Sequence, residues 1–405
     1  MTIPLDNLYH YIDDQFNGNA LIYRFYPHGA KKQCNLWPLE DIQAYDTIIK
    51  PVCICHDQEP LQFDLYSYSN QIDYLNSTVP LELHDHLKKH NLDFDTWANI
   101  YQKKILLHSE LKSTELDKYE SSGLFAGAYY WSHAFIARDW YRYAKVDPKL
   151  CKQPNIDWLF NVYCRAWTGS RSYRLKFLEK LKQSPALFES RVRFSHYDNG
   201  EHYDQYTSAT FDFFENTADS NSSAGYDPED IKSSLFDVVL ETVVDRIMLT
   251  EKVLRPIACG QPFILMAGAG SLKLLQSYGF RTFSQYIDES YDDIEDTDLR
   301  MQAVVDTMAR ARNMDIKKFQ DQLLAIAEYN KNHFFSDEFF EQISSELQQN
   351  LKIASYCAYK KKAFPLVTVN HWSLPVSLHD PVTIQQAIVF CKNTIPVNPL
   401  RWKHG

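Results

Sequence analysis

Residues 235–279 read LFDVVLETVVDRIMLTEKVLRPIACGQPFILMAGAGSLKLLQSYG. Of the whole sequence, this stretch indicates the fold class most clearly. Two apolar runs in it, 235–242 and 261–267, predict buried strands. Each run is followed by a helical pattern that ends in a glycine, at 249–260 and at 271–279. Strands and helices that alternate over such short connections are typical of a parallel α/β layer with right-handed crossovers.

The same alternation extends towards the N-terminus. Residues 158–167 and 191–197 predict two further strands, and 174–182 between them has the apolar spacing of an amphipathic helix. The apolar runs 46–56 and 103–111 predict strands of an earlier α/β half. We therefore expect an α/β protein with two Rossmann-like halves, followed by a helical C-terminal extension.

A domain boundary is expected at 146–155, where two prolines coincide with a change in composition. The predicted domains are an N-terminal domain at 1–150, a C-terminal domain at 151–350 and a tail at 351–405. Residues 215–230 are polar and contain glycine and proline, so they predict a long surface loop.

The overall composition argues against several classes of protein. The chain of 405 residues carries 42 basic and 52 acidic residues, and its net charge of −10 disfavours a broad nucleic-acid-binding face. Its eight cysteines form no CxxC pair, which argues against a structural zinc site, and their scatter fits a reducing cytosol. The N-terminus lacks the pattern of a signal peptide, and no run of about eighteen apolar residues occurs. We expect a cytoplasmic protein without a membrane span.

The segment LTEK at 249–252 has the chemistry of a nucleotide-binding site. A helix is predicted to begin at Thr250, whose hydroxyl suits an N-cap. A helix N-terminus presents free N–H groups and partial positive charge, which favour phosphate. Lys252 opposes the helix dipole there, and a bound anion would explain its position. Glu251 can accept two hydrogen bonds from a ribose diol. The structural alternative is an exposed Glu-Lys pair on an amphipathic helix.

The run LTEKVLRPIACGQPFIL at 249–265 resembles the donor-binding segment of GT-B glycosyltransferases of the α1,3-fucosyltransferase-like type. The pattern of that family is Tyr-hydrophobic-Thr-Glu-Lys, a short helix, then Gly-x-Pro and a strand. The resemblance implies that Glu251 contacts the donor ribose and Lys252 the phosphates, while Met248 stands where the family has its tyrosine. The wider run as far as Arg300 also looks like uncharacterised glycosyltransferase-like proteins of phages and marine bacteria.

A second match lies upstream, where RLKFLEKL at 174–181 resembles the family's Arg-x-x-Phe-x-x-x-Leu. The family arginine binds the diphosphate, and the resemblance places this role on Arg174. A planar guanidinium suits it because it can hold two phosphate oxygens. Arg171 lies one turn away and could share the role. An exposed Arg174 on an amphipathic helix is the structural alternative.

The resemblance implies a GT-B-like architecture, in which two Rossmann-like domains face each other across a cleft. The domain at 1–150 would bind the acceptor, 151–350 would bind the nucleotide sugar, and 351–405 would pack back on the first domain. The implied reaction moves a sugar from a nucleotide-diphosphate sugar to a hydroxyl acceptor, with inversion and without a metal or other cofactor. A glycan or other hydroxyl compound is the expected acceptor, and the negative charge makes modified DNA less favoured.

Acidic residues after two N-terminal strands are candidates for the catalytic base, which must take a proton from the acceptor hydroxyl. HDQEPLQFDLY at 56–66 resembles the family segment Glu-Asn-Glu-Ser-Pro, whose first acid is the proposed base. This match places Asp57 opposite the base and Glu59 at the second acid, and it does not separate the two. Glu110, in the polar end of the run 103–111, is a third candidate.

Three further side chains are candidates for the acceptor cleft: His108, His133 and Trp140. His108 follows a predicted strand, and the other two belong to the aromatic-rich stretch 129–144, which predicts a short strand and a helix. Packing in the core is the structural alternative for each of them.

Two other functions are compatible with parts of the sequence. Asp296 and Asp298 have the Asp-x-Asp spacing of a metal-dependent GT-A transferase, but they lie in an acidic stretch where helix-capping acids are expected. A non-catalytic protein that binds a nucleotide sugar or a glycan is the other alternative. The AGAGS stretch at 267–271 lacks the lysine of a P-loop, and its glycines would let a strand end approach the donor closely.

Overall fold

The computed structural model describes residues 12, 20–24, 52–56, 59–61, 104–121, 125–150, 156–216 and 224–359. The chain divides into two compact units. We call Met1–Ser132 together with Ile343–Gly405 the flanking unit, and His133–Gln342 the central unit. In the described part of the chain, no helix is long and apolar enough to cross a membrane.

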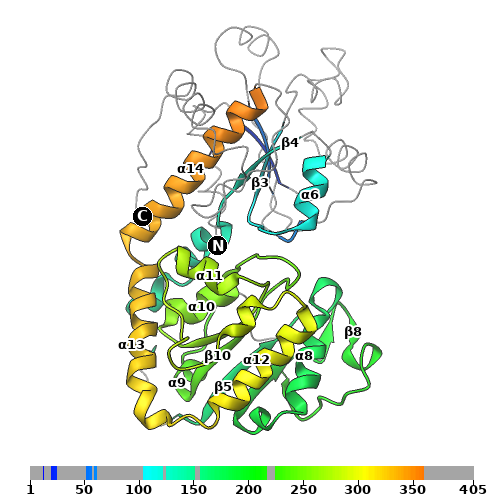
Figure 1. Ribbon diagram of the computed structural model, residues 1–405, viewed down its shortest axis with the longest axis vertical. Helices are drawn as coiled ribbons and strands as arrows, with labels where there is room; N and C mark the ends of the chain where they lie inside the picture. The colour runs from blue at the N-terminus through cyan, green and yellow to red at the C-terminus, as the bar shows by residue number, and fades with distance from the viewer. Residues whose placement is uncertain are drawn as a thin grey trace. The chain divides into compact units, whose positions relative to one another are not determined.

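The flanking unit contains a parallel sheet (Figure 1). Its described strands lie in the order β1 (Ala20–Arg24), β2 (Val52–His56), β3 (Lys104–His108) and β4 (Phe125–Tyr129). β4 is buried along its whole length, as is typical of parallel strands that are covered on both faces. The chain between β3 and β4 forms the helix α6 (Thr114–Ser121), which supplies the crossover that parallel strands need.

The helix α14 (Asp337–Tyr359) returns the chain to the flanking unit. Three of its buried apolar residues recur at every fourth position and therefore share one face: Ile343, Leu347 and Leu351. Asn350 donates from Nδ2 to the carbonyl oxygen of Tyr129, at the end of β4, over 2.9 Å. The tail was predicted at 351–405, and residues 360–405 lie outside the described part of the chain.

The central unit contains a five-stranded sheet in which every pairing is parallel. Its order is β11 (Phe263–Met266), β10 (Ser234–Leu240), β5 (Trp158–Cys164), β6 (Ser190–Phe194) and β9 (Glu215–Asn216). The first three strands in the chain, β5, β6 and β9, lie side by side in that order. The next two, β10 and β11, lie on the other side of β5. This is the strand order of a doubly wound α/β sheet.

The described helices of this unit are α7 (Ser132–Trp140), α8 (Tyr173–Lys182), α9 (Pro228–Ser233), α10 (Glu251–Cys259), α11 (Ser271–Ser277), α12 (Thr297–Ala311) and α13 (Ile316–Phe334). α8 and α10 connect strands in opposite directions across the sheet, so right-handed crossovers put them on opposite faces. α8 packs against α12, and α10 packs against α13 (Figure 1). The sheet therefore has a helical layer on each side.

The pattern predicted for 235–279 is confirmed as β10, α10, β11 and α11. Thr250 is the N-cap of α10, since its hydroxyl accepts from the N–H of Lys252 at 3.4 Å. Gly260 ends the helix in a left-handed conformation with φ of 68°, which favours glycine.

The long loop predicted at 215–230 is wrong at both ends, while 217–223 lies outside the described residues. It begins with the edge strand β9 and ends in α9. Asp227 and Pro228, which suggested a turn, instead begin this helix. The side chain of Asp227 accepts from the N–H of Glu229 at 2.9 Å, and proline fits the first helical position.

The two units divide at 132/133 and 342/343, whereas the sequence suggested 150 and 350. The reason is that α7 and the start of α14 pack within the central unit. The ring of Phe135 lies 6.1 Å from that of Phe340, and Arg138 donates to the carbonyl oxygen of Ser336 over 3.1 Å. A proline-rich stretch marks a change in local structure, which need not coincide with the boundary of a core.

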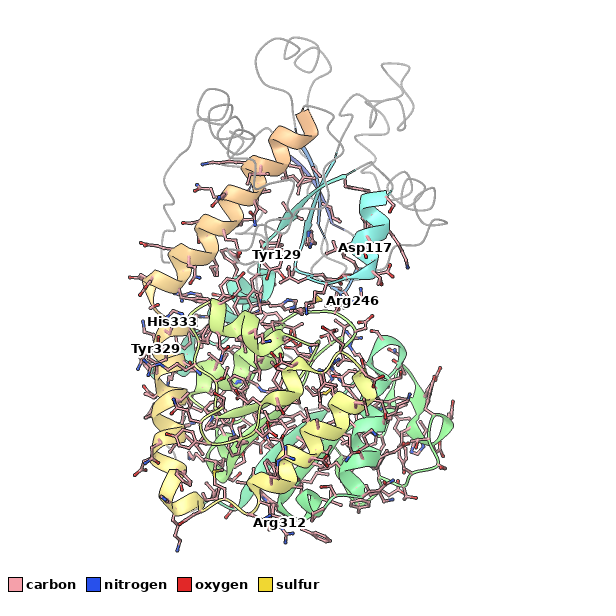
Figure 2. The ribbon with its side chains drawn as sticks, in the orientation of Figure 1. Asp117, Tyr129, Arg246, Arg312, Tyr329 and His333 are labelled. Atoms are coloured by element: carbon pink, nitrogen blue, oxygen red, sulfur yellow. The ribbon has the colours of Figure 1, made fainter. Side chains whose placement is uncertain are left out.

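A buried arginine joins two loops at the carboxyl end of the central sheet. Arg300 on α12 donates from Nε to the carbonyl oxygen of Ala267 over 2.9 Å, and from Nη2 to that of Val244. Gly268 lies very close to the loop after β10. A Cβ at this position would lie 1.9 Å from the carbonyl oxygen of Arg246, labelled in Figure 2. The close approach that the glycine permits is therefore to the chain's own backbone.

Replacing Gly268 by alanine should lower the free energy of unfolding by at least about 2 kcal/mol, because the loop must move to make room for the new methyl group. Urea denaturation measures this loss. Gly200→Ala is the matched control: Gly200 has φ of 84°, but no atom lies within 4 Å of the place that a methyl group would take. Its left-handed conformation alone should cost about 1 kcal/mol. Equal losses in the two variants would contradict the close-contact explanation.

Candidate functional site

The central sheet has a topological switch point between β5 and β10, where the strand order reverses. In doubly wound sheets, ligands bind at this point, outside the carboxyl ends of the strands. Two connections begin there, the loop from β5 to α8 and the loop from β10 to α10. The residues that the sequence singled out at 171–174 and 250–252 belong to the starts of these two helices or directly precede them.

Glu241, the first residue after β10, organises the second loop. Its fully buried carboxylate accepts from the N–H of Thr250 at 3.0 Å, from the hydroxyl of Thr250 at 2.5 Å and from the N–H of Thr242 at 3.1 Å. These bonds close the loop end to end and fix the start of α10. Glu241 was not among the residues predicted from the sequence. The available signal was an acid that ends an apolar strand shortly before an N-cap threonine.

Glu251 and Lys252 form an ion pair at the N-terminus of α10. Nζ of Lys252 lies 2.8 Å from Oε1 of Glu251 and donates to the hydroxyl of Thr242 over 3.0 Å. The Lys252 side chain is 27% exposed, whereas that of Glu251 is 8% exposed. The alternative of an exposed Glu-Lys pair is therefore wrong for Glu251.

The ionisation of Glu251 is set by competing effects. Burial raises its pKa, but the electrostatic effect of Lys252, that of the neighbouring His133 and the hydrogen bond from Lys252 outweigh burial and bring the pKa down to about 2. Glu251 is therefore a carboxylate at neutral pH and can only accept hydrogen bonds.

His133, on α7, approaches the second oxygen of Glu251. Its Nε2 lies 3.5 Å from Oε2 of Glu251, and both side chains are buried. The hydroxyl of Tyr141 donates to the carbonyl oxygen of Glu251 over 3.3 Å. The structure thus places His133 beside a predicted donor-site residue. Trp140, another predicted acceptor residue, ends α7 and is half-buried.

Arg174 is buried and joins the two loops of the switch point. Its Nη1 donates to the carbonyl oxygen of Ala166 over 2.7 Å, and its Nη2 donates to those of Leu240 and Glu241 over 2.9 and 2.8 Å. The alternative of an exposed Arg174 is wrong, since only 3% of the residue is exposed. Most of its hydrogen-bonding capacity is used by the backbone, so its first role is to hold these loops together.

The loop after β5 is closed by an acid in the same manner as the loop after β10. Oδ2 of Asp198 accepts from the N–H groups of Trp167 and Thr168, at 2.8 and 2.7 Å, and from the Thr168 hydroxyl at 2.7 Å. Burial raises the pKa of Asp198, but these hydrogen bonds outweigh it and lower the pKa. Arg171 follows in this loop, is half-buried and directly precedes Ser172, the N-cap of α8.

Four of the five predicted donor-site residues thus belong to one hydrogen-bonded cluster: Arg174, Thr250, Glu251 and Lys252. Arg174 binds the backbone oxygen of Glu241, while the carboxylate of Glu241 binds Thr250, and Lys252 and Glu251 follow directly. The cluster combines a partly exposed ammonium group with two neighbouring helix N-termini. This combination of an ammonium charge and the partial positive charge of helix N-termini suits an anion such as a phosphate group.

The candidate catalytic acids lie in the flanking unit, apart from Asp57, which is outside the described residues. Glu110 is fully buried, and its Oε1 accepts from the N–H of Leu61 at 2.6 Å. This bond joins the chain after β2 to the chain after β3. Glu59, two residues before Leu61, is half-buried. The structure therefore brings the two acidic segments together beyond the carboxyl ends of β2 and β3.

His108, a predicted acceptor residue, is fully buried at the end of β3. Burial lowers its pKa to about 3 and outweighs an opposing backbone contact with Glu110. Its Nδ1 accepts from the N–H of Glu110 over 3.4 Å. The imidazole is therefore neutral at physiological pH. Core packing, the alternative considered for His108, agrees with this environment.

The Asp-x-Asp spacing near residue 297 serves a helix terminus, as expected. Oδ1 of Asp296 accepts from the N–H of Leu299 at 2.9 Å, which makes Asp296 the N-cap of α12. Asp298 pairs with Lys180 over 3.2 Å at the surface. Within the ranges that the structure describes, no group of three or more His, Cys, Asp or Glu residues is arranged to hold a metal ion.

Comparison of the sequence with known proteins adds no relative to this picture. No protein-family model matches the chain, and no curated protein matches it either.

Glu241→Gln should lower the free energy of unfolding by about 3 kcal/mol, because the amide group cannot accept all three hydrogen bonds and leaves buried donors unpaired. Urea denaturation of the variant and the unmodified protein measures the change. Glu229→Gln is a suitable control, since its side chain is 77% exposed and should change the stability by less than about 0.5 kcal/mol. A Glu241→Gln variant as stable as this control would refute the role of the carboxylate.

The stability should also depend on His108 at acidic pH. The unfolded chain binds a proton at this histidine below its ordinary pKa of 6.5, whereas the folded protein does so only near 3. The contribution of His108 is therefore present above pH 6.5 and is lost as the pH falls from 6.5 towards 3. Urea denaturation across this range should show a slope that His108→Phe reduces by up to about 1.4 kcal/mol per pH unit. An unchanged slope would contradict a buried, neutral imidazole.

Proposed function

We propose that the protein is a glycosyltransferase that moves a sugar from a nucleotide-diphosphate sugar to a hydroxyl acceptor. The observation that carries the proposal is the cluster around Glu241, in which Arg174, Glu251 and Lys252 meet at the switch point of a doubly wound sheet. Had these side chains belonged to separate surfaces, the resemblance of their sequence motifs would have had no structural basis.

In this proposal the donor diphosphate lies at the N-terminus of α10. The partly exposed ammonium group of Lys252 and the partial positive charge of the helix N-terminus offset its charge. Arg171 adds positive charge at the start of α8. Glu251 accepts hydrogen bonds from the ribose hydroxyls, and its low pKa keeps it in the accepting form. Arg174 supports the site through the two loops that it joins.

The transfer inverts the sugar carbon in a single displacement. A carboxylate takes the proton of the acceptor hydroxyl, and the acceptor oxygen forms a bond to the anomeric carbon. The bond from that carbon to the diphosphate breaks, and its electron pair stays on the leaving phosphate oxygen. Lys252 and the N–H groups of α10 stabilise the developing charge, so the reaction needs no metal ion.

The acceptor side of the proposal belongs to the flanking unit, with the two units arranged as in GT-B enzymes. Asp57, Glu59 and Glu110 are the candidates for the base. The hydrogen bond from Leu61 to Glu110 brings the segments of Glu59 and Glu110 together beyond the carboxyl ends of β2 and β3, which supports acids of these segments as candidates. A glycan or another hydroxyl compound is the proposed acceptor.

A thermal-shift screen against UDP-, GDP- and dTDP-sugars and a CMP-sugar tests donor binding. A donor present at about a hundred times its dissociation constant should stabilise the protein by about 2.7 kcal/mol, which raises the melting temperature by about 5 °C. Glu251→Ala and Lys252→Ala should each abolish most of this shift, because they remove the proposed ribose and phosphate contacts.

Lys273→Ala is the matched control for the screen, because Lys273 is also a lysine near a helix start but is 67% exposed and pairs with Asp293 at the surface. It should retain the full shift. The absence of a shift with every donor, or equal shifts in all variants, would overturn the proposal. Binding without hydrolysis or transfer of the sugar would instead favour a non-catalytic nucleotide-sugar-binding protein.

A further inference from the structure

A segment far from α10 in the sequence holds the ribose-binding carboxylate of the proposed function. The segment comprises α7 and the residues directly after it, and it reaches Glu251 at two points. Nε2 of His133 lies 3.5 Å from Oε2 of Glu251, and the hydroxyl of Tyr141 donates to the backbone oxygen of Glu251 over 3.3 Å. Both the side chain and the backbone of Glu251 are therefore in contact with this segment.

The segment is itself held firmly against the rest of the central unit. Arg138, one turn after His133, donates to the carbonyl oxygens of Phe334 and Ser336, where α13 ends. Its guanidinium group also lies 5.3 Å from the centre of the Phe340 ring. His133 therefore approaches Glu251 from a fixed helix rather than from a loop, which favours precise positioning.

The two oxygens of Glu251 have different partners. Oε1 is bound by Lys252 at 2.8 Å, and Oε2 faces His133. Lys252 is partly exposed and next to the proposed phosphate position, so it can be drawn towards a diphosphate. His133 is only 5% exposed and has no such freedom. If the ammonium group of Lys252 leaves Glu251 to contact a bound phosphate, His133 remains beside Oε2 and can still orient the carboxylate.

We infer that His133 is a positioning residue for ribose recognition: it holds the Glu251 carboxylate in the orientation that accepts hydrogen bonds from the ribose hydroxyls. This inference rests on the proposed function, because it needs a nucleotide at the N-terminus of α10. It moves His133 from the acceptor side, where the sequence suggested it, to the donor side. It also predicts a specific defect, which is loss of ribose discrimination without loss of phosphate binding.

Calorimetric titration with UDP, GDP, their 2′-deoxy forms and inorganic pyrophosphate tests this inference. The unmodified protein should prefer the ribonucleotides about tenfold, as expected for one hydrogen bond to a charged group. His133→Ala should reduce this preference to less than about threefold and leave pyrophosphate affinity within about twofold. His133→Gln should restore most of the preference, because its amide nitrogen can donate to the same oxygen.

A double-mutant cycle with Glu251→Gln distinguishes positioning from a general structural role. If His133 acts through Glu251, then adding His133→Ala to Glu251→Gln causes no further loss of ribose preference. A preference that His133→Ala leaves unchanged, or a matching loss of pyrophosphate affinity, would overturn the inference. His133→Phe, whose ring fills the same space without a donor, provides the same readouts if the alanine variant does not fold.

The outcomes for the unmodified protein separate this inference from the proposed function. If it binds no nucleotide and no pyrophosphate, the proposed function fails. If it binds the deoxy forms as tightly as the ribonucleotides, the ribose contact and the role of His133 both fail, whereas a phosphate site at α10 stands.

Discussion

A buried carboxylate determines the shape of the candidate site. Glu241 has no exposed surface, and a charge without partners in such a position would cost several kcal/mol. Its three hydrogen bonds offset this cost only while Thr242 and Thr250 keep their places. The requirement for partners therefore holds the loop after β10 in one conformation. The position of the α10 N-terminus, with Glu251 and Lys252 on it, follows from that loop.

Two buried arginines extend the same constraint to the neighbouring loops. Arg174 donates to backbone oxygens of both loops at the switch point, and Arg300 donates to backbone oxygens after β10 and β11. Carbonyl groups at strand ends have lost their ladder partners and need others when they are buried. A guanidinium group offers five donors in one plane, so a single arginine can join several such segments. These bonds hold together the loops that follow the carboxyl ends of the strands.

Two histidines of the chain illustrate how environment assigns a role. His108 lies at a strand end where burial dominates, and its pKa of about 3 keeps the ring neutral. His133 is also buried, but it faces the carboxylate of Glu251 and contributes to the low pKa of that group. Both were equivalent candidates for an acceptor cleft on sequence grounds. Their neighbours, contributed by other segments of the chain, separate a core residue from a residue of the site.

The structural features that depend on residues near one another in the chain could be predicted from the sequence. The apolar runs and helical periods of 235–279 predicted two strands and two helices correctly, and Thr250 and Gly260 marked the two ends of α10. Capping and periodicity are local, so they can be read from a short window. The chemistry of Glu251 and Lys252 at a helix start was visible for the same reason.

Contacts between segments that are distant in the sequence could be seen only in the tertiary structure. The strand order, the contacts of Arg174 with residues 240 and 241, and the approach of His133 to Glu251 depend on how the whole sheet and its helices pack. The division into units at 132/133 has the same origin, since it depends on which core α7 joins. Such contacts join residues that have no fixed spacing in the chain, so no local pattern records them. Glu241 follows an apolar strand nine residues before an N-cap threonine, but its importance comes from three buried donors that only the folded loop presents to it.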